Sequence, residues 1–257
     1  MSLQSRQGHS APPYSTFAGL YDALMGNSMF PLLRRNFHSL VNRYRIGFRS
    51  LADVACGTGA FLRLISPRLT EAFGIDRSPS MLRIAARKNR GRRVRFLKQD
   101  LRDLDLPHPV DLITCHFDSL NYLLSLKDLA RTFRRFSVNL KKGGHLIFDM
   151  VTEFVREPQM GIGQQVFQLP GIVSVWNIAW NPDRQLRVVT MHHFAVGREA
   201  SRSYQREVHV QRPYPIATVI RLLAGAGFKL RGVHDAGTLS PASSCSYRAV
   251  YVAQRLR

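Results

Sequence analysis

The stretch Leu51–Phe61, LADVACGTGAF, decides the fold class of this 257-residue chain. Its apolar start is typical of a buried strand, and two glycines, Gly57 and Gly59, follow one residue apart. Because glycine has no Cβ, such a turn lets a ligand approach the backbone closely. A helix that begins directly after the turn offers unpaired N–H groups and the positive end of its dipole. The stretch therefore predicts a ligand-binding strand–turn–helix unit.

Strands and helices alternate on both sides of this stretch. The apolar patterns predict strands at 50–55, 72–76, 94–98, 111–116, 144–150, 228–233 and 247–254. Helical spacing of apolar residues predicts helices at 59–65, 80–88, 126–140 and 215–224. This order indicates an α/β protein with a doubly wound, mostly parallel seven-stranded sheet, covered by helices on both faces.

Two segments fall outside this alternation. Short helices at 17–25 and 31–44 precede the first strand, and strands at 173–180, 186–194 and 204–211 follow one another without a helix. We expect the latter to form an antiparallel β insertion that acts as a lid. The chain then divides into an N-terminal arm with lid helices (1–46), a cofactor-binding core (47–155), a substrate-covering insertion (156–212) and a C-terminal helix with the closing strands (213–257).

Composition limits the class of protein. No run of 18 apolar residues occurs, and the polar first residues lack the apolar centre of a secretory signal, so we expect no membrane span and no export. The three cysteines, Cys56, Cys115 and Cys245, lie far apart and are odd in number, which fits the reducing cytoplasm better than a disulfide framework. The oligomeric state stays open.

The turn itself distinguishes between ligands. A phosphate loop of the nucleoside triphosphatase type needs Gly-Lys followed by Ser or Thr, and the chain has no such sequence. A dinucleotide-binding turn needs a third glycine at position 62, where Leu62 stands. Both readings are therefore disfavoured, and the remaining one is S-adenosylmethionine, which has no pyrophosphate.

Residues Asp53–Gly59 resemble the first motif of class I S-adenosylmethionine-dependent methyltransferases, in their small-molecule branch. The usual form is acid-x-G-x-G-x-G, and Ala55 stands here at the first glycine. Further matches follow in the family's order: Phe73–Asp76 resembles the second strand with its terminal acid, Gln99–Leu101 the segment that reads adenine, and Gly143–Asp149 the fifth strand.

This resemblance implies S-adenosyl-L-methionine as the cofactor. Asp76 would accept the ribose hydroxyls, Asp53 would contact the cofactor directly or through water, and Asp100 would accept from the adenine amino group. A structural reading stays open beside each role: Asp53 could brace the loop, and Asp100 could be an exposed turn residue. The implied cofactor-binding set is Asp53, Ala55, Cys56, Gly57, Gly59, Asp76, Arg77, Met81, Asp100, Leu101 and Phe117.

Methyl transfer depends mainly on alignment, and it needs a general base only when the acceptor arrives protonated. The string Tyr14–Met25 resembles the lid of small-molecule methyltransferases, which implies that Tyr14 and Tyr21 lie near the reacting atoms. His116, at the end of the fourth strand, is the candidate base. Because no residue stands out as a dedicated base, an amine acceptor is favoured over an oxygen acceptor.

The other histidines give weaker indications of a functional role. His192 and His193 are adjacent and should point to opposite faces of a strand, so they cannot bind one metal ion together. Glu207 and His209 should share a face, and one of them could reach the substrate. We expect no metal site, because neither H-x-x-x-H nor a cysteine pair occurs.

The chain is strongly basic, with a net charge of +20. Six basic residues fall within Arg87–Arg95, and we expect this segment on the rim opposite the ligand edge of the sheet. This placement favours a small-molecule substrate, with an RNA methyltransferase as the alternative that the charge motivates. A binding protein that keeps the fold without turnover is a second alternative.

Overall fold

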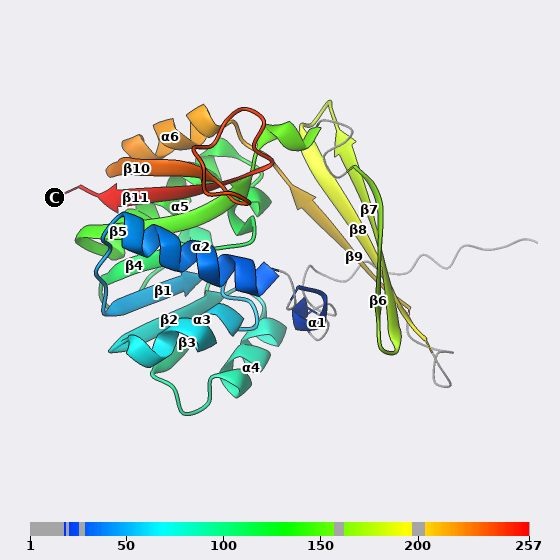
Figure 1. Ribbon diagram of the computed structural model, residues 1–257, viewed down its shortest axis with the longest axis horizontal. Helices are drawn as coiled ribbons and strands as arrows, with labels where there is room; N and C mark the ends of the chain where they lie inside the picture. The colour runs from blue at the N-terminus through cyan, green and yellow to red at the C-terminus, as the bar shows by residue number, and fades with distance from the viewer. Residues whose placement is uncertain (1–17, 19–20, 26–28, 157–161, 197–203, 257) are drawn as a thin grey trace, which may run out of the picture.

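The computed structural model describes residues 18, 21–25, 29–156, 162–196 and 204–256. Two sheets organise this part of the chain (Figure 1). The larger sheet has seven strands in the order β10-β11-β5-β4-β1-β2-β3, and the smaller has four in the order β6-β7-β8-β9. The expected doubly wound sheet with an antiparallel insertion is therefore confirmed.

In the larger sheet only β11 runs against its neighbours, because it pairs antiparallel with both β10 and β5 while the other pairs are parallel. Its strands are β1 (Ser50–Val54), β2 (Glu71–Asp76), β3 (Val94–Lys98), β4 (Val110–Cys115), β5 (Leu140–Val151), β10 (Phe228–Asp235) and β11 (Arg248–Arg255). The described helices are α1 (Tyr21–Met25), α2 (Met29–Arg43), α3 (Ala60–Ile65), α4 (Pro79–Lys88), α5 (Leu126–Val138) and α6 (Ile216–Gly225), with short 3₁₀ turns at Ser66–Arg68, Leu101–Asp103, Ser119–Tyr122 (η4) and Glu153–Arg156.

Helices cover both faces of this sheet. On one face, Phe37 and Leu40 of α2 pack with Phe61 and Leu62 of α3 against alternate strand residues such as Leu51. On the other face, α5 and α6 bury a second cluster that contains Phe133, Phe136, Val219 and Leu223. Sequence encodes this division, because residues two apart in a strand share a face, whereas neighbours point to opposite faces.

The insertion is a four-stranded antiparallel sheet of β6 (Gly163–Leu169), β7 (Ile172–Asn181), β8 (Leu186–Ala195) and β9 (Tyr204–Gln211). One face is buried, and its apolar half consists of Trp176, Ile178, Val189 and Met191. Tyr21 and Leu24 of α1 pack against this cluster, so α1 lies between the two sheets (Figure 1).

The insertion is attached to the core by a hydrogen-bonded joint around Asn121. The side chain of Asn121 donates to the carbonyls of Val151 and Arg212 and accepts from the N–H of Val151. Its own carbonyl accepts from the N–H of Arg212. Because Asn121 is fully buried and its amide is satisfied, we assign it a structural role rather than contact with a substrate.

Most expected elements agree with the structure to within two residues, and the exceptions have physical causes. Strand β6 was not predicted, because its sequence, GQQVFQL, is mostly exposed and lacks an apolar alternation; it is a strand through its pairing with β7. The strand expected at 144–150 begins earlier, at Leu140, and β5 contains Gly143 with a positive φ of 77°. The helix expected at 17–25 is described as a helix from Tyr21 to Met25.

Among the described helices, none has the length and apolar character that crossing a membrane requires.

Candidate active site

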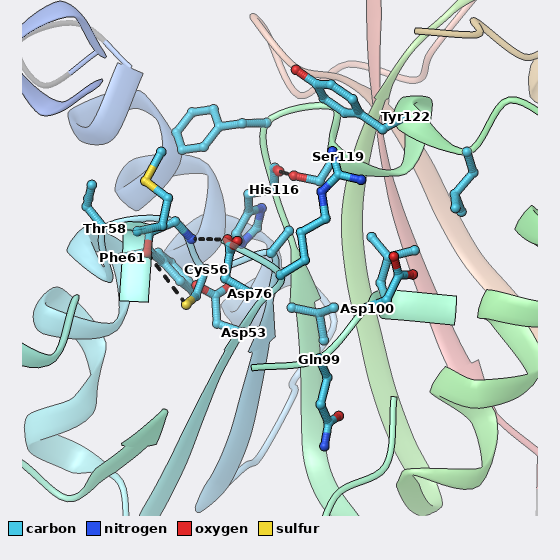
Figure 2. Close-up of a pocket in the computed structure, with 18 of the residues that line it drawn as sticks. Asp53, Cys56, Thr58, Phe61, Asp76, Gln99, Asp100, His116, Ser119 and Tyr122 are labelled. Atoms are coloured by element: carbon cyan, nitrogen blue, oxygen red, sulfur yellow. Dashed lines mark hydrogen bonds between the residues drawn. The ribbon is translucent and has the colours of Figure 1, made fainter. Parts of the chain in front are cut away.

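A cavity of about 330 Å³ opens at the carboxyl ends of β1, β2 and β4 and beside the segment after β3 (Figure 2). Ligands of doubly wound sheets bind at this edge. The lining residues are Tyr21, Phe30, Asp53, Val54, Ala55, Cys56, Gly57, Thr58, Phe61, Asp76, Arg77, Met81, Gln99, Asp100, Leu101, Arg102, His116, Phe117, Ser119, Tyr122, Leu123, Leu124 and Asp128.

The turn after β1 is built from left-handed backbone. Ala55, Gly57 and Gly59 have φ values of 58°, 54° and 68°. A Cβ on Gly57 would meet nothing within 4 Å, so this residue leaves open space on the cavity side. A Cβ on Gly59 would lie 2.7 Å from Asn89 Nδ2 and 3.0 Å from Ala85 Cβ.

Gly59 differs from Gly57 in its surroundings, and its expected contact with the cofactor stays a prediction. It does not line the cavity, and its missing side chain lets α4 pack against the turn. The amide of Asn89 completes this contact by donating to the carbonyl of Gly59 at 3.2 Å. The two glycines thus serve different purposes: one leaves space at the cavity and the other permits contact between helices.

Asp76 ends β2 at the cavity wall. Its Oδ2 accepts from the N–H of Gly57 at 2.9 Å, and its Oδ1 accepts from the N–H of Ser78 at 2.8 Å. Burial raises the pKa of Asp76, although these two backbone N–H groups oppose the shift. The carboxylate therefore fixes the turn and the start of α4 while lining the cavity, where Figure 2 places it beside Cys56.

Asp53 lies at the end of β1 with 3% of its surface exposed. Its Oδ1 accepts a hydrogen bond of 2.8 Å from the hydroxyl of Thr114 on β4. Burial raises the pKa of Asp53 to about 6, against the lowering effects of His116 and of Thr114. A cationic ligand in the cavity would favour the ionised form of this acid.

His116 follows β4 and lines the cavity, with its ring 4.7 Å from the ring of Phe61. Its Nδ1 is 3.8 Å from Asp149 Oδ2, and its Nε2 is buried without a hydrogen-bond partner among the residues the structure describes. Burial by itself would raise the pKa of Asp149, but Arg248 and His116 outweigh it and hold that pKa at about 2. His116 is thus positioned beside the ion pair of Asp149 and Arg248.

The expected adenine-binding residues line the far end of the cavity. Asp100 is held by Arg102, which donates to it through its backbone N–H and through Nε and Nη2 at 2.8–2.9 Å. These hydrogen bonds outweigh burial and lower the pKa of Asp100. Met81 and Leu101 line the same region, Met81 being 2% exposed.

Aromatic side chains close the other end. Tyr21 lies 6.5 Å from Phe30 between ring centroids, and Phe30 lies 5.5 Å from Phe117. The hydroxyl of Thr58 donates to Asp22 of α1 at 2.6 Å, which ties this helix to the turn after β1. Tyr14 lies outside the described residues.

All other expected site residues line the cavity. Arg102, Thr58, Phe30 and Tyr122 also line it and were not expected there. Arg102 and Thr58 lie within three residues of expected positions, so the local motif could have included them. Phe30 and Tyr122 carry no local signal, because only the folding of α2 and η4 brings them to the cavity.

The basic segment Arg87–Arg95 is only partly where it was expected. Arg90, Arg92, Arg93 and Arg95 are exposed, and the segment leads into the amino end of β3. The first part of this segment lies near the turn after β1 instead, because Lys88 forms an ion pair with Asp22 of α1. The reason is the packing of α4 across the turn through Gly59, which the sequence pattern does not reveal.

Comparison with known proteins agrees with this geometry. Residues 51–144 match the family model described as a methyltransferase domain. The Bacillus subtilis (strain 168) protein named "Putative methyltransferase YqeM" is 29% identical over 245 residues, which are 94% of this chain and 97% of that protein. The dTDP-4-amino-2,3,4,6-tetradeoxy-D-glucose N,N-dimethyltransferase of Saccharopolyspora spinosa is 37% identical over 101 residues, which are 39% of this chain and 40% of that enzyme.

The fold has a solved counterpart. The crystal structure of an S-adenosylmethionine-dependent methyltransferase from Clostridium acetobutylicum ATCC 824 matches with a TM-score of 0.83 at 24% identity. The match covers 95% of this chain and 99% of that one. The likeness therefore includes the insertion as well as the larger sheet.

Sheet order, glycine turn and cavity together define a Rossmann-like methyltransferase. The chain carries a methyltransferase domain at residues 51–144, and it is an S-adenosylmethionine-dependent methyltransferase with S-adenosyl-L-methionine as its cofactor. The expectations from the sequence on enzyme class and cofactor are confirmed.

Proposed function

We propose that this enzyme transfers the methyl group to the nitrogen of a small-molecule amine. The observation that carries the proposal is the cavity of small-molecule size at the sheet edge, whose wall residue Tyr21 packs against the buried face of the insertion sheet. A similar relative, the enzyme of Saccharopolyspora spinosa, is named for N,N-dimethylation of an amino sugar, which supports an amine acceptor.

The residues present fit the cofactor. A cavity of about 330 Å³ falls within the size range of small-molecule sites. We propose that Asp76 accepts the ribose hydroxyls, that Asp53 serves the methionine end, and that Asp100, Met81 and Leu101 surround the adenine. When bound, the cofactor supplies an electrophilic methyl group on a sulfonium.

We propose further contacts with this cofactor. Ala55, Cys56, Gly57, Arg77 and Phe117 would border it, and Tyr21, Tyr14 and His116 would lie nearest the reacting atoms. Aromatic faces favour a sulfonium by about 0.5–2 kcal/mol, which suits Tyr21 and its neighbours.

We propose that different segments of the chain enclose the acceptor and hold the cofactor. Residues 1–46 and 156–212 would enclose the acceptor, while residues 47–155 and 213–257 would hold the cofactor. Cys245 is an exposed free thiol, which supports a reducing compartment, and we propose the cytoplasm.

The first experiment tests the cofactor site. Calorimetry at pH 7.5 should show S-adenosyl-L-methionine binding to the parent chain at micromolar Kd or tighter, and no measurable binding to Asp76→Ala. Asp183→Ala is the matched control, because Asp183 is an exposed acid in the β7–β8 turn, and it should bind as the parent does. Parent-like affinity in Asp76→Ala would remove the ribose assignment.

The second experiment tests the acceptor. The parent chain is incubated with labelled cofactor and a panel of dTDP-amino sugars, simple alkylamines, alcohols and phenols, and methylated products are identified by mass spectrometry. We expect N-methylated amines. Transfer to oxygen acceptors alone would contradict the amine proposal.

RNA methylation remains the alternative, supported by the exposed arginines of the Arg87–Arg95 segment. Binding to RNA that is strong and falls steeply with salt, together with methyl transfer to RNA, would favour it. Absence of RNA binding at low salt would exclude it.

A further inference from the structure

Arg102 lies at the adenine end of the cavity, although the sequence gave no reason to expect it there. It belongs to the 3₁₀ turn Leu101–Asp103, which follows β3, and it lines the cavity together with Asp100 and Leu101. Figure 2 shows Asp100 across the cavity from Cys56. Arg102 is therefore in the part of the cavity where we propose that the adenine binds.

Arg102 holds the carboxylate of Asp100 by three hydrogen bonds. Its backbone N–H and its Nε donate to Oδ1 at 2.9 and 2.8 Å, and its Nη2 donates to Oδ2 at 2.9 Å. Two parallel bonds from one guanidinium fix a carboxylate in orientation as well as in position. Asp100 is therefore held in one orientation before any ligand binds.

These bonds leave Asp100 with a single open acceptor position. A carboxylate offers about four lone-pair positions, two on each oxygen. Oδ1 uses both for the backbone N–H and Nε of Arg102, and Oδ2 uses one for Nη2. Among the described residues no other donor is hydrogen-bonded to Asp100, so one position on Oδ2 remains for a ligand.

The loop that carries this pair is itself fixed. The side-chain amide of Gln99 donates to the carbonyl of Asp105 at 2.8 Å and accepts from the N–H of Asp105 at 3.0 Å, which closes the loop around Asp100 and Arg102. Nη1 of Arg102 also lies 4.0 Å from Oδ2 of Asp128 at the start of α5. A group held in this way loses little freedom when a ligand binds to it.

The protonation state of Asp100 decides what the open position can bind. The side-chain hydrogen bonds from Arg102 outweigh burial and lower the pKa of Asp100, so the carboxylate is ionised at neutral pH. An ionised carboxylate only accepts hydrogen bonds. The position on Oδ2 therefore suits an N–H donor, such as the exocyclic amino group of a purine.

We propose that Arg102 makes the cofactor site selective for a 6-aminopurine, because it keeps the open position of Asp100 in place for the amino group. Asp100 touches the base, and Arg102 is a positioning residue that acts through Asp100. The inference rests on the proposed contact between Asp100 and the adenine, and it deepens that proposal by naming the chemical group that the contact recognises.

Two substitutions separate the fork of Arg102 from its charge. In Arg102→Ala, Asp100 keeps its carboxylate but loses its fixed orientation, and immobilising it again on binding costs about three- to tenfold in affinity. Arg102→Lys keeps the positive charge but cannot form two parallel hydrogen bonds with one carboxylate. Because the side chain of Arg102 is 42% exposed, both variants should fold, which urea unfolding checks.

The same turn offers a matched control. Arg131 of α5 pairs with Asp103, the last residue of the turn Leu101–Asp103. Neither side chain lines the cavity, and both are more than half exposed. Arg131→Ala therefore removes an arginine–aspartate pair from the same turn without changing the cavity wall.

The test compares two ligands that differ in one group. They are S-adenosyl-L-homocysteine, the demethylated cofactor product, and its 6-deamino analogue, in which hydrogen replaces the adenine amino group. Dissociation constants are measured by calorimetry at pH 7.5, and the ratio of the two constants is compared between variants. The parent chain should bind the analogue at least about tenfold more weakly, because a hydrogen bond to a charged group is lost.

The variants should change this ratio in a defined way. In Arg102→Ala and Arg102→Lys it should fall by about three- to tenfold, because binding of S-adenosyl-L-homocysteine weakens while the analogue stays within about twofold of the parent. Arg131→Ala should leave both constants unchanged. In an Asp100→Ala background, adding Arg102→Ala should have no further effect on the ratio, since Arg102 acts through Asp100.

Each other outcome would overturn a different statement. A ratio that Arg102→Ala leaves unchanged, or that it still lowers in the Asp100→Ala background, would overturn the inference. A parent-like ratio in Arg102→Lys would overturn the role of the fork. A parent chain that binds both ligands equally would instead remove the contact between Asp100 and the adenine, and no binding of S-adenosyl-L-homocysteine would remove the cofactor site. These failures are thus distinguishable.

Discussion

The contrast between Gly57 and Gly59 leads to a quantitative prediction. Both have left-handed backbone, at φ 54° and 68°, so alanine at either position brings the same backbone strain of about 1–2 kcal/mol. Alanine also lowers the conformational entropy of the unfolded chain, which stabilises the folded state by about 0.4–1 kcal/mol. Gly57→Ala should therefore reduce the free energy of unfolding by about 1 kcal/mol, because its Cβ meets nothing within 4 Å.

Gly59→Ala has an additional cost. Its Cβ would lie 2.7 Å from Asn89 Nδ2, and Asn89 cannot easily move because its amide also donates to the carbonyl of Ala85 at 2.9 Å. Overpacking of a buried site typically costs about 1–3 kcal/mol. We therefore expect Gly59→Ala to lose about 2–4 kcal/mol in total.

The assay is urea unfolding of the cofactor-free chain at 25 °C, followed by calorimetry with S-adenosyl-L-methionine. Gly57→Ala should weaken binding by at least about tenfold, or about 1.4 kcal/mol, because the new methyl group occupies cavity space. Gly59→Ala should bind within about threefold of the parent wherever it is folded. Equal losses of stability, or a larger loss of affinity in Gly59→Ala, would refute the assignment of separate roles.

Two further predictions concern the same edge of the sheet. Ala55→Gly should increase the free energy of unfolding by about 1 kcal/mol, because it relieves the strain at φ 58°; an unchanged urea midpoint would contradict this. Asp53→Asn should be more stable than the parent at pH 7 by roughly 3 kcal/mol, with no difference near pH 4. The pKa of Asp53 rises from 3.8 to about 6 on folding, so the parent loses stability as pH rises through this window. A stability difference that stays constant between pH 4 and pH 7 would contradict it.

The sequence predicted the strands and helices around the cofactor because their signals are local. Apolar runs, glycine spacing and helix caps act within a few residues; Ser78, for example, caps α4 by accepting from the N–H of Met81. The acid at the end of β2 was found in the same way, because strand ends in a parallel sheet meet at one edge.

The contact between Tyr122 and His209 could not be predicted from the sequence. The sequence named His116 as the candidate base, and it gave no signal for the contact between Tyr122 and His209, because these residues are 87 positions apart and belong to no recognisable motif. It did place Glu207 and His209 on one face, since that depends only on the alternation of a strand. What faces them depends on how η4 and β9 meet, and this is fixed by the buried joint at Asn121.

By itself, then, the sequence determined the sheet, the glycine turn, the cofactor and the acids at the ends of β1 and β2, because short-range periodicity and turn chemistry specify them. Only the tertiary structure decided that Gly59 serves helix packing, that β6 is a strand and that Tyr122 meets His209. Each of these depends on contacts between segments distant in sequence, and the free energy of such contacts has no local pattern from which it can be inferred.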